Sequence, residues 1–390
     1  MSMAQNIATG IRRTRILIVD DSAVMRSLLR TVAGKDAGLE VAGVAADGEA
    51  ALAAIEALRP DLVLLDVEMP VMDGLATLKQ LRSRGHRMPV IMCSSLTQRG
   101  ARVTIEALAG GASDYVAKPS NQSSREAAIE ALFHELVPKI HALTNSARIA
   151  AQPAAPSSAP GGIFAPLTLA QPAKPQPLPS SPPTVLAIGV STGGPAALDI
   201  LLPALPASFP LPVLIVQHMP EVFTRLFAER LNGRCRLQAR EAAEGDPVRP
   251  GTIYVARGDR HMVVLAGLRP GAPNTLHLTQ GPLENHCRPA ADVLFRSVAA
   301  VYGAGALAVV LTGMGSDGLA GCRLIRDRGG SILAQDQATS AVWGMPGAVA
   351  NASLAHKVLP LGQLAGEIIR LAGKTQFEAG RPRDPAVVRC

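Results

Sequence analysis

Three polar residues, each at the end of an apolar run, are of the types that together perform acyl-transfer chemistry. Ser191 follows VLAIGV, His218 follows PVLIVQ, and Asp317 lies near the end of ALAVVLTGMGSDG. A serine hydroxyl becomes a nucleophile when a histidine accepts its proton and a carboxylate orients that histidine. If these residues meet in the fold, they predict a serine hydrolase.

The glycine-rich turn that contains Ser191 has a second possible use. Glycine lets the backbone approach a phosphate group held at a helix N-terminus. A phosphate-binding loop would end in GK[ST], or would contain GxGxxG followed by an acidic ribose contact. GVSTGGP has neither pattern. The sequence therefore favours Ser191 as a nucleophile.

Other residues of the second half could also supply the base or the acid, because spacing in sequence does not give distance in the fold. They are His261, His277 and His286 for the base, and Asp246, Asp259, Asp292 and Asp336 for the acid. His218 is favoured because it ends a strongly apolar run, whereas His277 lies in an alternating pattern typical of an exposed strand. His286 is the main alternative, because it precedes a predicted helix and could line the same cleft.

A second set of chemically capable residues lies at the ends of apolar runs in the first half of the chain. It consists of Asp20, Asp21, Asp66, Ser94 and Lys118. Crowded carboxylates raise one another's proton affinity unless they share a cation, and an all-oxygen site suits Mg²⁺. The lysine and the hydroxyl would then hold an incoming anion. One aspartate alone could be a helix N-cap, but five such residues at the ends of four strands favour a functional site.

The elements that must position these residues are the strands of parallel sheets. In the first half, apolar runs at 15–21, 39–45, 61–66, 89–95 and 114–119 alternate with amphipathic segments. This alternation predicts a five-stranded parallel sheet with helices on both faces. The second half has similar buried-strand runs and is also predicted to be an α/β domain. Ligands of such sheets bind outside the carboxyl ends of the strands, where both residue sets are expected.

Composition divides the chain and narrows its class. Residues 146–183 form a tract rich in proline, alanine and serine that has neither helical nor strand periodicity, and we interpret it as a tether. The formal net charge is +7, but the basic residues are dispersed and aromatic residues make up only 3%, so no nucleic-acid partner is predicted.

The N-terminal residues and the cysteines indicate a cytoplasmic protein. MSMAQNIATGIRRTR lacks the apolar core of a secretory signal, and no run reaches the roughly 18 apolar residues of a membrane span, so no membrane insertion is expected. The five cysteines include no CxxC pair, which is typical of reduced structural thiols.

The motifs DDS, LLDVEMPVMDG, CSS and KP resemble the receiver domain of bacterial two-component response regulators over residues 14–142, with a flavodoxin-like fold. The resemblance implies that Asp66 accepts a phosphoryl group from a chemotaxis sensor histidine kinase. It also implies that Asp20, Asp21 and Asp66 bind Mg²⁺ together with the backbone carbonyl of Glu68. Ser94 and Lys118 would contact the phosphoryl oxygens. Pro138 is expected to interrupt the last receiver helix.

The motifs GVSTGGP, QHMP, RPAADVLFRS, LTGMGSDG and VWGMPGAV resemble the catalytic domain of the CheB family, the chemotaxis protein-glutamate methylesterases, over residues 184–372. The resemblance implies a Rossmann-like α/β domain with Ser191, His218 and Asp317 as the triad. The backbone N–H groups of Thr192 and Met314 would stabilise the oxyanion, and hydrolysis would need no cofactor. The implied substrates are glutamate methyl esters, and often glutamines, of methyl-accepting chemoreceptors.

The combined domain plan is a receiver at 14–142, a linker at 143–183, a methylesterase domain at 184–372 and a disordered tail at 373–390. Two other classes stay open. A DNA-binding response regulator would need a helix-turn-helix with clustered basic residues, which the strand-rich second half does not suggest. A silent scaffold that only competes for phosphoryl groups would release no methanol from a methylated receptor, whereas an esterase would.

Overall fold

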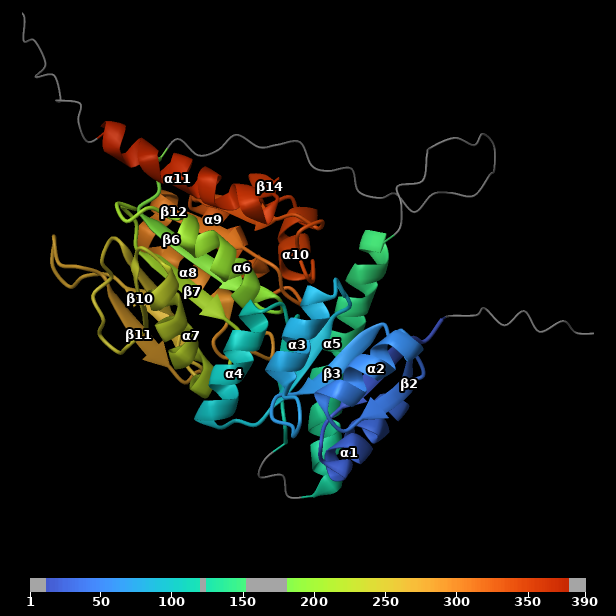
Figure 1. The fold of residues 1–390 in the computed structure, drawn as a ribbon. Helices are drawn as coiled ribbons and strands as arrows, with labels where there is room; N and C mark the ends of the chain where they lie inside the picture. The colour runs from blue at the N-terminus through green and yellow to red at the C-terminus, as the bar shows by residue number, and fades with distance from the viewer. Residues whose placement is uncertain (1–11, 120–123, 152–180, 379–390) are drawn as a thin grey trace, which may run out of the picture. The chain divides into compact units, whose positions relative to one another are not determined.

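The computed structural model describes residues 12–119, 124–151 and 181–378. The chain divides into two compact units, Met1–Gln152 and Pro153–Cys390. Each unit is built on its own sheet (Figure 1).

The first unit is a five-stranded parallel sheet flanked by helices, as the sequence predicts. Its strands lie in the order β2-β1-β3-β4-β5, and every neighbouring pair is parallel. In chain order the elements are β1 (Thr14–Val19), α1 (Ala23–Gly34), β2 (Leu39–Ala45), α2 (Gly48–Leu58), β3 (Leu62–Asp66), α3 (Gly74–Ser83), β4 (Val90–Ser94), α4 (Gln98–Ala109), β5 (Asp114–Ala117) and α5 (Arg125–Ala151).

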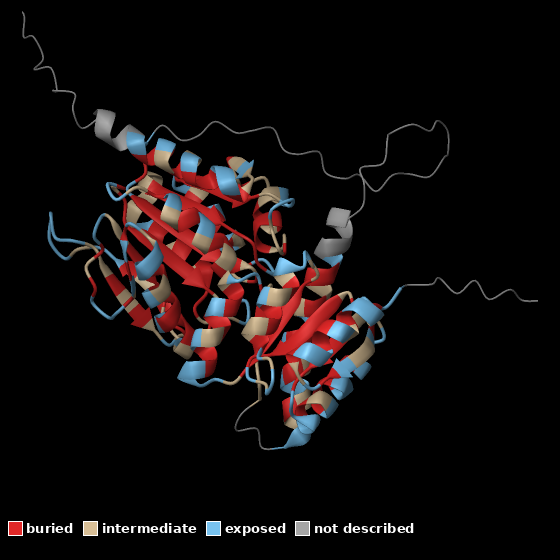
Figure 2. Ribbon diagram, viewed as in Figure 1, coloured by how far each residue is buried: buried red, intermediate tan, exposed pale blue. Residues whose placement is uncertain are grey.

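Local sequence explains where the helices of this unit begin. Ser22, Asp47, Asp73 and Thr97 lie just before α1, α2, α3 and α4, and each side chain accepts a hydrogen bond from a first-turn backbone N–H. Such caps satisfy donors that the helix itself cannot. Of the strands between these helices, β3 and β4 are buried at every residue, whereas the edge strand β2 is buried only at its first and last residues (Figure 2).

Helix α5 corrects two expectations. It continues through Pro138, so the prediction that this proline interrupts the helix is wrong. A proline removes one N–H donor, but Leu136 and Ile140 on either side of it are each 1% exposed, and their burial holds the helix together. The helix also runs to Ala151, past the predicted domain end at residue 142, because HALTNSARIAA contains no proline or glycine to stop it.

The second unit contains a seven-stranded sheet in the order β14-β13-β12-β6-β7-β9-β8, in which every neighbouring pair is parallel. An antiparallel hairpin, β10 with β11, stands apart from it. The elements are β6 (Val185–Val190), α6 (Gly194–Leu201), η1 (Leu202–Ala204), β7 (Val213–Gln217), α7 (Glu221–Arg234), β8 (Gln238–Glu241), β9 (Thr252–Val255), β10 (His261–Leu265), β11 (Thr275–Thr279), α8 (Ala291–Tyr302), η2 (Gly303–Gly305), β12 (Ala306–Val310), α9 (Leu319–Asp327), β13 (Ser331–Gln335), α10 (Met345–Asn351), β14 (Lys357–Leu359) and α11 (Leu361–Glu378).

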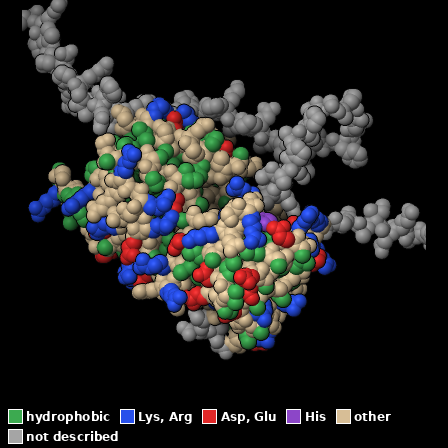
Figure 3. All heavy atoms as spheres, viewed as in Figure 1, with side chains coloured by type: hydrophobic (Ala, Val, Ile, Leu, Met, Phe, Trp, Pro, Cys, Tyr) green, Lys and Arg blue, Asp and Glu red, His purple; other side chains and the backbone are tan. Residues whose placement is uncertain are grey.

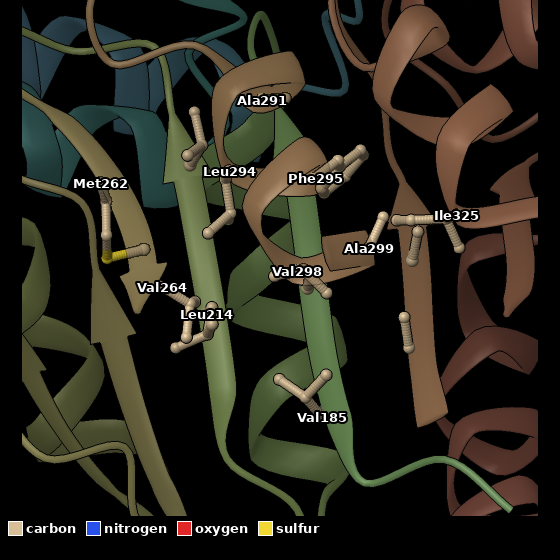
Figure 4. Packing of buried hydrophobic residues seen from close by; sticks show 14 of the residues in the cluster. Val185, Leu214, Met262, Val264, Ala291, Leu294, Phe295, Val298, Ala299 and Ile325 are labelled. Atoms are coloured by element: carbon tan, nitrogen blue, oxygen red, sulfur yellow. The ribbon is translucent and has the colours of Figure 1, made fainter. Parts of the chain in front are cut away.

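Helix α8 joins the sheet to the hairpin through one apolar core. Leu294, Phe295 and Val298 are fully buried on α8 and belong to one apolar cluster with Leu214 of β7 and Val264 of β10. In Figure 4, Leu294 lies on the side of α8 toward Leu214 and Val264, and Phe295 lies on the side toward Ile325. Burying an apolar side chain of this size contributes about 1.5–3 kcal/mol. This packing fixes the position of the α8 N-terminus relative to the strand ends.

The three central strands of this sheet lead to the three residues that the sequence singles out. Strand β6 lies between β12 and β7. Val190, the last residue of β6, pairs with Gln217, the last residue of β7. Ser191 and His218 are therefore the next residues on two adjacent strands. Asp317 lies in the loop between β12 and α9.

The end of the chain differs from the predicted tail. Helix α11 continues to Glu378, beyond residue 372, where disorder was predicted. Lys374, Gln376 and Glu378 are residue types that favour helix, which explains the extension. Residues 379–390, and residues 152–180 of the predicted linker, lie outside the described residues.

Surface charge and helix hydropathy agree with the composition. Over the described residues on the face shown in Figure 3, Lys and Arg side chains are interspersed with Asp and Glu side chains. Within the described parts of the chain, no helix combines the length and the apolar character needed to cross a membrane.

Candidate functional site

Ser191 stands on a tight turn between β6 and α6. Its backbone N–H donates to the carbonyl of Thr312 at 3.0 Å, and its carbonyl accepts from Gly194 N at 2.8 Å and from Gln217 Nε2 at 3.0 Å. Gly193, two residues on, has a φ of +76°, a conformation that glycine adopts without strain. The backbone of Ser191 is thus held from three directions.

Gly313 brings the loop after β12 against this turn. A Cβ atom added at Gly313 would lie 2.9 Å from Ser191 Cβ, a separation that real Cβ atoms essentially never show, and 3.1 Å from Ser191 N. Only a residue without a side chain can stand there. Gly313, the first glycine in LTGMGSDG, therefore lets the Asp317 loop pack directly on the Ser191 turn.

His218 forms a short hydrogen bond with Asp317. Its Nε2 atom lies 2.7 Å from Asp317 Oδ2, and its Nδ1 atom lies 3.5 Å from Cys287 Sγ. Burial disfavours the charged imidazolium, but the contacts with Asp317 and Cys287 outweigh burial and raise the pKa of His218 to about 9. Nδ1 is therefore the ring nitrogen that Asp317 leaves for proton transfer.

The Asp317 carboxylate, 2% exposed, is surrounded by N–H donors. Oδ2 accepts from Ala291 N at 2.6 Å, and Oδ1 accepts from Asp292 N at 3.0 Å, Gly318 N at 3.0 Å and Asn285 Nδ2 at 2.9 Å. Burial raises the pKa of Asp317, but His218 and the backbone donors outweigh it, so the net shift is downward. Two of these donors belong to the first turn of α8, where the helix dipole also favours negative charge.

The other candidate histidines have structural partners or stand apart. His261 is 2% exposed, and its Nε2 atom lies 2.9 Å from the carbonyl of Pro282. His277 lies on the exposed side of β11, as predicted, with Nδ1 2.5 Å from Glu244 Oε1. His286 is exposed at the tip of a turn.

The other candidate acids likewise bond elsewhere. Asp246 accepts from Arg240 and from Ala243 N, and Asp259 pairs with Arg288. Asp292 accepts from Gly321 N at 2.6 Å, and Asp336 accepts from Thr339. Among the described residues, Asp317 is the acid that these hydrogen bonds join to a candidate histidine.

The two residues expected to stabilise an oxyanion lie beside Ser191. Thr192 follows it directly, and the Thr192 carbonyl accepts from Thr312 Oγ1 at 2.9 Å. Met314 follows Gly313 in the loop that packs on the Ser191 turn. Within the described part of the chain, the hydrogen bonds include no acceptor for the Met314 N–H. That N–H is available to a ligand.

In the first unit, the strand ends gather the predicted acidic residues around Lys118. Lys118 Nζ lies 2.8 Å from both Asp20 Oδ2 and Asp66 Oδ1. Carboxylate oxygens of Asp20, Asp21 and Asp66 lie within 4.8 Å of one another. A cluster of hard oxygen donors at this spacing fits Mg²⁺. Burial raises the pKa of Asp66 against the opposing effect of Lys118.

Ser94 and Glu68 are the two other residues predicted for this site. Ser94 ends β4 opposite Ala117 of β5, the residue before Lys118, and its Oγ atom lies 2.7 Å from Thr104 Oγ1. Glu68 follows Asp66 by two residues, and its exposed side chain forms an ion pair with Arg99 at 3.2 Å. The strand ends thus place the predicted phosphoryl-contacting residues at one edge of the sheet.

Comparison with known proteins agrees with both halves of this description. Residues 186–368 match the family model described as CheB methylesterase, and residues 16–130 match the response regulator receiver domain. A protein-glutamate methylesterase/protein-glutamine glutaminase of Nocardioides sp. is 50% identical over 359 residues, which cover 91% of this chain and 94% of the relative. The chain belongs to the CheB methylesterase family.

A second curated relative has nearly the same extent as this chain, and a solved structure matches its second half. The protein-glutamate methylesterase/protein-glutamine glutaminase of Trichodesmium erythraeum is 48% identical over 360 residues, covering 92% of this chain and 99% of the relative. The crystal structure of the Thermotoga maritima CheB methylesterase catalytic domain is 38% identical and covers 48% of this chain and 98% of its own, with a TM-score of 0.47. The predicted family and the order of receiver and methylesterase domain are confirmed.

Two residues that contact Asp317 and His218 were not singled out from the sequence. Asn285 donates to Asp317, and Cys287 contacts His218. Both lie in the segment ENHC just before the RPAADVLF motif. Their closeness to that motif was the one available signal, and it drew attention to His286 instead.

Proposed function

We propose that this enzyme hydrolyses methyl esters of glutamate side chains on the cytoplasmic domains of chemoreceptors and deamidates receptor glutamines at the same site. The observation that carries the proposal is the 2.7 Å hydrogen bond between His218 and Asp317, beside the turn that presents Ser191 on the adjacent strand. The relatives named above as methylesterases and glutaminases support the choice of substrate.

In the proposed reaction, His218 Nδ1 accepts the hydroxyl proton of Ser191 while the serine Oγ attacks the ester carbonyl carbon. Asp317 holds the ring through Nε2 and stabilises the imidazolium. The proton then passes from His218 to the departing methoxide. Methanol departs, and the acyl group remains bonded to Ser191 Oγ. Water, deprotonated by the same histidine, then attacks the acyl carbon. The bond to Ser191 Oγ breaks, Oγ takes the proton from His218, and the glutamate carboxylate is released. Deamidation follows the same steps with ammonia as the leaving group.

The oxyanion formed in both halves of this reaction needs donors that are in place beforehand. We assign this role to the backbone N–H groups of Thr192 and Met314. Gly313 supports the assignment, because it brings Met314 into the loop that packs on Ser191. Such donors stabilise developing charge without having to reorient in the transition state.

The receiver unit is proposed to accept a phosphoryl group on Asp66 from a chemotaxis histidine kinase. Asp20, Asp21 and Asp66, with the Glu68 carbonyl, would hold Mg²⁺, whose charge offsets repulsion between carboxylates and phosphate. Ser94 and Lys118 would bind the phosphoryl oxygens. The kinase and the receptor glutamates of this proposal are both cytoplasmic, so we propose that the protein works in the cytoplasm.

Phosphorylation of Asp66 is further proposed to raise esterase activity by relieving inhibition by the receiver. The proposed division is a receiver that ends with α5, a connecting segment, and an esterase domain that begins near Thr184. This predicts that a fragment starting near Thr184 is faster than the unphosphorylated full-length enzyme. A fragment that is no faster would show that the receiver acts in another way.

The test of the proposed activity is methanol release from a methylated chemoreceptor fragment by the full-length protein. Wild-type protein should release methanol stoichiometrically with new glutamate carboxylates, and Ser191→Ala should lose about 10⁶-fold in turnover. Ser340→Ala, a hydroxyl deletion elsewhere in the same domain, is the matched control. Methanol release that persists unchanged in Ser191→Ala, or that is absent from the wild type, would overturn the proposal.

A further inference from the structure

A four-residue turn, Glu284 to Cys287, lies against the acid and the base from outside the sheet. Glu284 N donates to the Cys287 carbonyl at 3.1 Å, and Cys287 N donates to the Glu284 carbonyl at 2.9 Å. The two residues between them, Asn285 and His286, have φ angles of 52° and 62°. Two successive left-handed residues define a type I′ turn, which favours asparagine. The turn therefore has a defined geometry of its own.

Ion pairs fix both ends of this turn to the domain. At its start, Glu284 makes two parallel bonds of 2.5 Å with Arg296 of α8. Just after its end, Arg288 donates to Asp259 and to the carbonyl of Gly281. Paired guanidinium–carboxylate bonds impose orientation as well as attraction. The turn is thus held to α8, the helix whose N-terminus also binds Asp317.

The turn sends one side chain to each member of the proposed acid–base pair. Asn285 is classed as exposed as a whole residue, but its Nδ2 atom donates to Asp317 Oδ1 at 2.9 Å and to Asp292 Oδ2 at 3.0 Å. Cys287 Sγ lies 3.5 Å from His218 Nδ1. His286, between them, is exposed. Asn285 and Cys287 therefore contact the proposed acid and base, whereas His286 between them does not.

The Asn285 amide reduces the repulsion between two buried carboxylates. Asp292 and Asp317 are both buried, and burial together with the nearby Asp317 charge raises the pKa of Asp292. A neutral amide that donates to both carboxylates lowers their repulsion without adding charge. It also fixes the rotation of the Asp317 carboxylate, and hence the direction of Oδ2 toward His218.

Cys287 contacts Nδ1 of His218, the ring nitrogen that the proposed reaction needs. With Nε2 bonded to Asp317, Nδ1 is left as the base, and the thiol is its partner in this structure. A thiol is a weak hydrogen-bond partner, so a serine hydroxyl can displace it with little loss. A stronger partner at this position would compete with Ser191.

We propose that the Glu284–Cys287 turn is a positioning element of the ester-hydrolysing site, in which Asn285 sets the orientation of Asp317 and Cys287 holds the His218 ring until Ser191 engages Nδ1. This inference rests on the proposed role of His218 as the base. It adds to that role two positioning residues that do not contact the reacting ester.

The test compares Asn285→Gly with His286→Gly in the full-length enzyme. Both positions have a positive φ that glycine adopts freely, so each change removes one side chain without straining the turn. Loss of a hydrogen bond to a charged group predicts a fall in kcat of about 10- to 100-fold for Asn285→Gly, with KM nearly unchanged. His286→Gly should keep the wild-type kcat. Equal kcat values for the two variants would overturn the role of Asn285.

For Cys287 the informative readout is the pH profile of kcat/KM. The groups facing His218 are Asp317 and Cys287, with Asp292, Glu284 and Arg296 behind them. Because contact with Cys287 raises the pKa of His218, Cys287→Ala should move the rise in kcat/KM to lower pH. Cys287→Ser, which restores a hydrogen-bonding group, should return it toward the wild type. A profile that is the same in all three proteins would overturn the role of Cys287.

Failure of this inference can be told apart from failure of the proposed function. The rate at which a fluorophosphonate labels Ser191 reports the base without any receptor substrate. If His218→Ala lowers that rate but Asn285→Gly and Cys287→Ala do not, the turn is only structural and the triad stands. If His218→Ala leaves the rate unchanged, the proposed function itself fails. Normalising each rate to the folded fraction, measured by circular dichroism, separates lost activity from lost protein.

Discussion

His218 bonds to Asp317 through Nε2, so the ring presents Nδ1, rather than Nε2, for proton transfer. In the chymotrypsin-type arrangement the acid holds Nδ1 and the base is Nε2. The proposed reaction uses the His218 ring in the opposite sense. This ring orientation follows from the fold. His218 is the residue after β7, and Asp317 reaches Nε2 from a loop whose carboxylate is bonded to the N-terminus of α8.

The raised pKa of His218 predicts how activity depends on pH. With a pKa of about 9 against an ordinary 6.5, the free enzyme carries a protonated His218 at neutral pH. A protonated imidazole cannot accept the serine proton, so kcat/KM should rise as pH rises through about 9. Steady-state methanol release between pH 6 and pH 10 measures this. A rise centred near 6.5 would show that Asp317 and Cys287 do not stabilise the imidazolium.

Replacing the acid tests the orientation of the ring. Asp317→Asn keeps the size of the side chain but removes the charge, and the amide can present N–H to Nε2 and favour the wrong tautomer. We expect kcat to fall by about 10³- to 10⁴-fold. Asp336→Asn is the matched control, because among the described residues the hydrogen bonds of the Asp336 side chain are both with Thr339. If the two variants were equally active, Asp317 would not be the orienting acid.

Phosphorylation of the receiver unit should require both Asp66 and a divalent cation. With acetyl phosphate and Mg²⁺, the wild-type protein should gain one phosphoryl group that phosphate-affinity electrophoresis resolves. Asp66→Asn should gain none, and EDTA should abolish the gain in the wild type, because the carboxylates of Asp20, Asp21 and Asp66 then repel the donor. Asp36→Asn, which lies outside the cluster, is the control. Labelling that survives EDTA would contradict the site.

The close approach at Gly313 predicts a cost in both stability and activity. In Gly313→Ala the new methyl group would meet Ser191 Cβ at 2.9 Å, so either the loop or the Ser191 turn must move. We expect about 1–3 kcal/mol less stability in urea unfolding, together with a loss of esterase activity. Gly366→Ala on α11, where nothing lies within 4 Å of the new Cβ, should keep both. Wild-type activity in Gly313→Ala would contradict the proposed role of the Met314 N–H in stabilising the oxyanion.

Much of the fold could be predicted because buried parallel strands read as continuous apolar runs. The runs that end at Asp66 and at Ser191 mark both the strand and the functional residue after it. Sequence order could not show that β6 lies between β12 and β7, yet this neighbourhood is what brings Ser191, His218 and Asp317 to one edge.

The rest depended on contacts that have no periodic signal. Asn285 and Cys287 act from a turn, where side-chain direction is set by two positive φ angles rather than by a strand or helix repeat. His286 attracted attention as a titratable residue, but the same turn points it outward. Pro138 was expected to break α5 because local propensity disfavours proline, and burial of its neighbours overrides that preference.

The central claim, that His218 activates Ser191, is tested most directly by covalent labelling of the full-length enzyme with a fluorophosphonate followed by mass spectrometry of its peptides. The account predicts one modified residue, Ser191, at a rate that falls by several orders of magnitude in His218→Ala and stays at the wild-type level in His286→Gly. Modification of a different residue, or labelling of Ser191 at the same rate in His218→Ala, would contradict it.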